Sequence, residues 1–91
     1  DETMRIWAKI FKNNRMLQDM VIENKEDMTR TKKIFAALDE ICYEFDLSKP
    51  IWLEANIEEF KRISKTRFRK DNFIDSVSFD FLEFHVIEED E

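Results

Sequence analysis

The sequence contains no glycine, and this absence removes whole classes of ligand-binding site. The glycine-rich loops of dinucleotide-binding and P-loop proteins let the backbone approach phosphate groups closely, and neither loop can be formed without glycine. Tight turns must instead use asparagine, aspartate, serine or the single proline, which suit turns or tolerate left-handed backbone. We therefore expect no nucleotide site of either usual kind.

Cysteine is nearly absent as well. The only cysteine, Cys42, excludes an internal disulfide and any metal site that needs several cysteine ligands. A lone thiol suits a reducing compartment, and neither a signal peptide nor an apolar run of about 18 residues is evident, so we expect a cytoplasmic protein that does not enter a membrane. No spacing of histidine, aspartate or glutamate is typical of a metal site, so we expect no metal and no cofactor.

Aromatic and charged residues are abundant instead. The 91 residues include nine phenylalanines and two tryptophans, and each buried ring removes about 150–250 Å² from water. That content can supply the core of one small domain, which we expect to span residues 1–91 with flexible ends at 1–3 and 88–91. The net charge of −6 argues against general nucleic-acid binding, because contacts with phosphates need a cationic surface.

An amphipathic helix is predicted from Asp27 to Leu47. Asp27 or Thr29 can accept hydrogen bonds from the free amides at its start, and Pro50 prevents it from continuing. Because the helix has one apolar face, it needs a second layer to cover that face. The apolar residues recur at the helical period and form one stripe: Ile34, Phe35, Leu38, Ile41, Cys42 and Phe45.

A β-hairpin is predicted before this helix, over residues 5–23, with Asn13 and Asn14 as its turn. Asparagine is the best residue after glycine for the positive φ angles of a type I′ turn. With an uninterrupted register, the face suited to packing under the helix carries Ile6, Ala8, Ile10, Leu17 and Val21. The other face carries Trp7, Phe11, Met16, Met20 and Ile22. Since that face is more apolar than solvent exposure requires, we expect a second element or a partner to cover it.

The second half of the chain predicts a short helix and a final strand. Asn56 is the expected N-cap of a helix that ends near Ser64 or Thr66. Residues 77–87 have apolar side chains on both faces, which favours a central strand paired antiparallel to residues 4–12. The predicted fold class is α+β: an antiparallel sheet of three or four strands, formed by the N-terminal hairpin and the C-terminal strand and packed by one long amphipathic helix and one shorter helix.

The charges of this second half are segregated along the sequence. Residues 71–91 contain eight acidic residues and no lysine or arginine. The preceding run contains only basic charges: Lys61, Arg62, Lys65, Arg67, Arg69 and Lys70. This basic run, with phenylalanines interleaved, is the candidate binding site for nucleic acid or an acidic protein. The alternative, which the negative net charge favours, is that it folds against the acidic residues that follow it or against the acidic end of the long helix.

His85 is the only histidine and the only candidate for acid–base catalysis. Glu83 lies on the same face of the predicted strand and could supply the second group that such chemistry needs. The pair meets only the first geometric requirement of a catalytic site, and a strand histidine beside carboxylates is more often a surface or boundary residue. Cys42 lies on the buried stripe without a local cation to activate it. We therefore expect no enzyme.

Three hypotheses for the function follow. The first is a non-enzymatic protein-interaction domain, which could form a homodimer through the open edge of strand 15–23. The second is binding of nucleic acid or another acidic partner through residues 61–70, and the third is a small enzyme that uses His85. An acidic mimic of nucleic acid that blocks a DNA-binding protein also fits the net charge.

Much of the chain resembles a small family of uncharacterised bacterial proteins of unknown function. The resemblance lies in residues 29–42, 46–53, 61–74 and 79–83, and so covers nearly the whole chain. It implies a stand-alone cytoplasmic domain. Because the family has no assigned activity, the resemblance implies no site residues.

Overall fold

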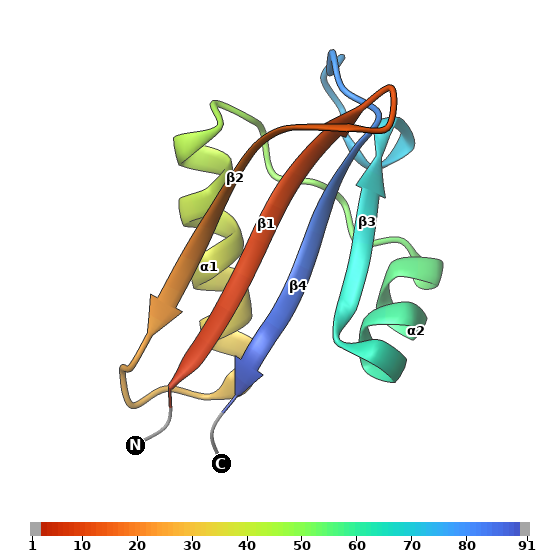
Figure 1. Cartoon of the computed structure of the whole chain (residues 1–91). Coiled ribbons are helices and arrows are strands. Elements are labelled where there is room, and N and C mark those ends of the chain that lie inside the picture. The colour runs from red at the N-terminus through yellow and green to blue at the C-terminus, as the bar shows by residue number, and fades with distance from the viewer. Residues whose placement is uncertain (1–2, 90–91) are drawn as a thin grey trace.

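The computed structural model describes residues 3–89 as one antiparallel sheet with two α-helices (Figure 1). The strands are β1 (Met4–Lys12), β2 (Arg15–Asn24), β3 (Lys65–Arg69) and β4 (Phe81–Glu89), and their order in the sheet is β2-β1-β4-β3. The helices are α1 (Arg30–Glu44) and α2 (Glu54–Ile63), and a short 3-10 helix, η1 (Lys70–Asn72), follows β3. The predicted α+β fold, with its N-terminal hairpin and C-terminal strand, is confirmed.

The hairpin turn lies where the sequence predicts it. Asn13 and Asn14 have φ angles of 53° and 64°, in the left-handed region that a type I′ turn requires. The backbone amide of Asn13 also donates to the carboxylate of Asp80 at 2.9 Å, which joins the turn to the loop before β4.

The hairpin register differs from the predicted one. A β-bulge pairs Ile10 with Gln18 and leaves Leu17 as an extra residue in β2. Because side chains alternate between the two faces of a strand, the extra residue reverses the faces of the remainder of β2. Ile22 is therefore buried with 7% of its surface exposed, whereas Val21 is 52% exposed. The prediction that Leu17 and Val21 pack under the helix was wrong, as was the placement of Ile22 on the opposite face.

α1 is shorter than the predicted helix 27–47 at both ends. Thr29 is the N-cap, and its hydroxyl oxygen accepts a hydrogen bond from the amide of Lys32 at 3.2 Å. Asp46 has a φ angle of 55°, which an α-helix cannot continue, so the helix ends well before the proline. The apolar stripe packs on the sheet except for Phe35, which is 48% exposed.

The core lies between the helices and one face of the sheet (Figure 1). α1 packs on β2 and β1, and α2 lies beside β3 at the other end of the sheet. Aromatic rings fill the space between the helices, since the ring of Trp52 makes edge contacts at centroid distances of 5.0–6.3 Å with Phe35, Phe60, Phe68 and Phe84. Phe68 and Phe84 have no exposed surface, so this cluster anchors β3 and β4 to the connection between the helices.

The start of α2 and the segment after it differ from the prediction. The helix begins at Glu54, and Leu53 is the N-cap in place of Asn56. Asn56 still satisfies the helix start, because its side-chain oxygen accepts a hydrogen bond from the amide of Leu53 at 3.1 Å. The helix ends before Ser64 as expected, and residues 65–69, for which no strand was predicted, form the edge strand β3.

β4 is a central strand, hydrogen-bonded to β1 on one side and to β3 on the other. This confirms the predicted antiparallel pairing with residues 4–12, although β4 begins later in the chain than the strand predicted over 77–87.

The chain ends are only partly described. Glu88 and Glu89, which we expected in a flexible tail, are the last two residues of β4, and Thr3 is buried. Residues 1–2 and 90–91 of the expected flexible ends lie outside the described residues. No helix within residues 3–89 is long and apolar enough to cross a membrane.

The hairpin bulge can be tested by comparing two neighbouring residues. Ile22→Ala is expected to lower the free energy of unfolding by about 2–4 kcal/mol, because it leaves a cavity in the core. Val21→Ala removes an exposed side chain and should cost less than about 1 kcal/mol. Urea denaturation of both variants measures the difference. An uninterrupted register places Val21 in the core, so a larger loss for Val21→Ala would contradict the bulge.

Candidate functional site

Neither helix covers the second face of the sheet (Figure 1). Side chains from all four strands meet there in rows that follow from the strand pairing. The first row holds Val21, Trp7, His85 and Lys65; the second holds Asp19, Lys9, Glu83 and Arg67; the third holds Met16, Phe11, Phe81 and Arg69. We call these three rows the open face.

Glu83 lies in the middle of the open face and forms ion pairs with two cations. Its carboxylate oxygens lie 2.9 Å from Nζ of Lys9 and 3.2 Å from Nε of Arg67, and its side chain is 6% exposed. Burial alone raises the pKa of Glu83, but the hydrogen bonds from Lys9 and Arg67 and the charges of Lys9 and Lys65 outweigh it and hold the pKa below the ordinary value of 4.5. The carboxylate is therefore ionised at neutral pH.

Aromatic rings lie on both sides of this ion-pair cluster. Phe11 and Phe81 stack with their centroids 5.1 Å apart, and Trp7 lies in the neighbouring row. Cations lie over these rings: Nζ of Lys9 is 3.7 Å from the centroid of the Trp7 ring, and the guanidinium carbons of Arg67 and Arg69 are 4.6 and 5.5 Å from that of Phe81. The open face thus alternates aromatic rings with positive charges, the arrangement of cation–π contacts.

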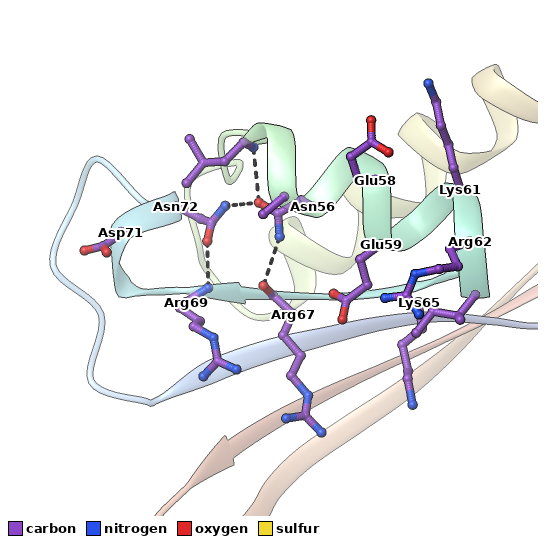
Figure 2. Close-up of a pocket in the computed structure, with 13 residues that line it drawn as sticks. Asn56, Glu58, Glu59, Lys61, Arg62, Lys65, Arg67, Arg69, Asp71 and Asn72 are labelled. Carbon is purple, nitrogen blue, oxygen red and sulfur yellow. Dashed lines mark hydrogen bonds between the residues drawn. The ribbon is translucent and has the colours of Figure 1, made fainter.

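Five of the six residues of the predicted basic site line one groove, all but Lys70, but their side chains do not all point in the same direction. Lys65, Arg67 and Arg69 alternate along β3 and point in one direction, whereas Lys61 points away from them on α2 (Figure 2). The remaining two lie outside the open face, Arg62 in the last turn of α2 and Lys70 at the start of η1. The side chains diverge because the run crosses the end of α2, a turn, the edge strand β3 and the start of η1, and the strand was not predicted.

The alternative prediction, that the basic run pairs with acidic residues of the same chain, is met by one residue. Arg67 forms an ion pair with Glu83, which belongs to the acidic segment 71–91. The other five basic residues of the run make no ion pair within residues 3–89. Their charges are therefore not neutralised by the fold.

Sequence reasoning missed the contribution of β1 and the role of Glu83. Lys9 lies between Trp7 and Phe11 at alternate positions, so the sequence already places all three on one face of a strand. What it does not give is the pairing with β4, which brings Glu83 from the other end of the chain to within hydrogen-bonding distance of Lys9.

A groove between α2 and β3 is the second feature near the basic run (Figure 2). Its lining mixes both signs of charge, with Glu58, Glu59 and Asp71 among the basic residues. The polar side chains at its base bond to one another and to the backbone: Asn56 Nδ2 donates to Thr66 Oγ1 at 2.8 Å and to the carbonyl of Arg67 at 3.0 Å, and Asn72 Nδ2 donates to Asn56 Oδ1 at 2.6 Å and to the carbonyl of Ile51 at 2.7 Å.

These amide contacts also close the outer edge of β3. The side-chain amide of Asn56 donates a hydrogen bond to the carbonyl of Arg67, and Asn72 Oδ1 accepts one from the backbone amide of Arg69 at 2.9 Å. Both backbone groups would otherwise be available to another strand. The polar groups of the groove therefore serve to hold α2 and η1 against β3. The open face is the stronger candidate site.

His85 lies on the open face but does not form the pair that the sequence suggested. No hydrogen bond joins it to Glu83 within residues 3–89, and Glu83 is engaged by Lys9 and Arg67. Burial, together with the charges of Lys65 and Lys9, lowers the pKa of His85, while Glu83 acts in the opposite direction. The enzyme hypothesis therefore has no supporting geometry at this position.

Neither the cysteine nor the possible metal ligands form a reactive site within residues 3–89. Burial and the charge of Asp39 raise the pKa of the Cys42 thiol to about 11, so the thiolate is scarce at neutral pH. No group of three or more histidine, cysteine, aspartate or glutamate side chains within residues 3–89 is placed to hold a metal ion.

No family model, no curated protein and no solved structure matches the chain. The resemblance to a small bacterial family in residues 29–42, 46–53, 61–74 and 79–83 therefore stays a prediction.

Glu83 makes stability depend on acid pH. Its pKa is lower in the folded chain than in the unfolded chain, so its contribution to stability is present above the unfolded value of 4.5 and is lost as the pH falls through the folded pKa. Urea denaturation should show that the free energy of unfolding declines below about pH 4.5 and that Glu83→Gln flattens this decline. Glu23 also has a lowered pKa, but it is present in both the native chain and the Glu83→Gln variant. If the two proteins lose the same stability on acidification, Glu83 is not the cause of the decline.

Proposed function

We propose that this protein is a non-enzymatic binding domain whose open face receives a polyanionic partner. The observation that carries the proposal is the clustering of Lys9, Lys65, Arg67 and Arg69 around half-buried aromatic rings on an uncovered sheet face, where these cations outnumber the two carboxylates, Glu83 and Asp19. A sheet face left to solvent is ordinarily polar throughout, so partly exposed rings between cations support an interaction surface.

The net charge of the chain does not describe this surface. Seven acidic residues lie in 71–80 and 88–91, and these two segments contain no lysine or arginine. A partner approaching the open face responds to the local potential, and there four cations stand against two carboxylates, Asp19 and Glu83. A single buried thiol, Cys42, suits the reducing cytoplasm that we propose as the setting.

The matched test compares two charge reversals of equal size. Lys65→Glu with Arg69→Glu changes the open face at positions that form no ion pair within residues 3–89, and Lys32→Glu with Lys61→Glu makes the same change on the helices. On a heparin column the first variant should elute at much lower salt than the native chain, and the second close to it. Equal elution of the two variants, or no retention of the native chain at low salt, would contradict the proposal.

β2 favours self-association as a second candidate function. It is an edge strand, and its exposed apolar side chains are Met16, Leu17 and Val21, at 48%, 55% and 52%. An edge strand with exposed apolar residues can pair with the same strand of another copy around a two-fold axis.

Sedimentation velocity over a range of protein concentrations tests this candidate. The native chain should form a dimer at high concentration, and Leu17→Lys with Val21→Lys should remain monomeric, because charges on an edge strand oppose pairing. A native chain that stays monomeric at every concentration would remove self-association as a function.

A further inference from the structure

We infer that the partner of the open face is a single-stranded nucleic acid, an inference that rests on the binding function proposed above. The inference is based on one arrangement: a line of cations on β3 lies beside aromatic rings on β4 and β1. A single strand offers both of the groups that such a surface can bind, phosphates and the flat faces of unpaired bases.

The cations have the spacing of a repeating contact. Lys65, Arg67 and Arg69 are alternate residues of one strand, so their backbone positions are about 6.6 Å apart in a straight line. They point in one direction from β3 (Figure 2), and Lys65 and Arg69 are free of ion pairs within residues 3–89. A chain of phosphates can follow this line at the edge of the sheet.

The rings supply the stacking positions. Phe11 and Phe81 form a stacked pair with an interplanar angle of 23°, and the guanidinium of Arg67 lies over Phe81. Unpaired bases stack on phenyl rings and on guanidinium planes alike. Trp7 provides a second position, about 13 Å from Phe11 along β1, with Lys9 between them.

The presence of both cations and aromatic rings favours single-stranded nucleic acid over other polyanions. An acidic protein can pair with the cations but brings no flat faces for the rings. A nucleic-acid duplex keeps its base faces inside the double helix, so it also meets only the cations. The rings on the open face therefore favour unpaired bases over both.

Glu83 limits the affinity of the site. Its carboxylate holds Lys9 and Arg67 at 2.9 and 3.2 Å, so a phosphate must compete with it for these cations. Removing this negative charge in Glu83→Gln should strengthen oligonucleotide binding by several-fold, although the same change weakens the fold. A merely structural role for the ion pairs predicts the opposite, weaker binding by a less stable protein.

The experiment uses fluorescence anisotropy with labelled single-stranded RNA and DNA of about 12 nucleotides, and with the matching duplex. We expect both single strands to bind at low salt, with a slope of log affinity against log salt of about −2 from three phosphate contacts. The duplex should bind at least about tenfold more weakly, because it leaves the rings unused. Comparison of the RNA and DNA arms identifies which single strand is preferred.

Ring variants distinguish stacking from charge. Phe81→Leu and Trp7→Leu keep apolar bulk but remove the aromatic face, and each should lower single-strand affinity by about five- to hundredfold while heparin retention stays unchanged. Phe35→Leu is the matched control, because Phe35 is an exposed phenylalanine on α1, away from the open face.

Each contrary result has a definite meaning. Heparin retention without oligonucleotide binding overturns the nucleic-acid inference and leaves the proposed function in place. Loss of both overturns both. Equal binding of single strand and duplex, with no effect of the ring variants, shows contacts with phosphates alone and also overturns the inference.

Discussion

β4 is hydrogen-bonded to a strand on each side, so its alternating side chains determine what the two faces of the sheet contain. Leu82 and Phe84 point into the core and have no exposed surface. Glu83, between them, must point to the other face, where it is nearly buried and holds Lys9 and Arg67. The strand-to-strand ion pairs therefore follow from the same two-residue alternation that fills the core, and they join β1, β4 and β3 on the face without helices.

Much of the fold could be predicted because local chemistry determines it. Asparagine at 13 and 14 fits the hairpin turn, Thr29 fits a helix start, and a 3.6-residue stripe fits a helix on a sheet. The bulge at Leu17 could not be predicted, because β2 has apolar residues on both faces and its pattern is compatible with either register. β3 carries the alternation of a strand, with Thr66 and Phe68 buried, but its residues were grouped by their charge and no strand was predicted there.

The candidate site was predictable only in part for a related reason. Sequence proximity grouped the basic residues 61–70, although strand geometry places three of them on the open face and the others elsewhere. The rings and the carboxylate that complete the surface come from β1 and β4, at opposite ends of the chain. Contacts between residues so far apart depend on pairing register, which no local pattern in this sequence specifies.

The pairing of the first strand with the last also bears on how the chain folds during synthesis. Met4 pairs with Glu89, so the sheet is completed only after residues 81–89 have left the ribosome. The hairpin and α1 can form earlier through local contacts, but until β4 arrives β1 keeps a free edge and Ile6, Ala8 and Ile10 are only partly covered. The nascent chain therefore passes through a stage in which β1 is paired on one edge only and its apolar side chains are partly uncovered. Substitutions in β4 are therefore expected to change the yield of folded protein as well as the stability of the folded state.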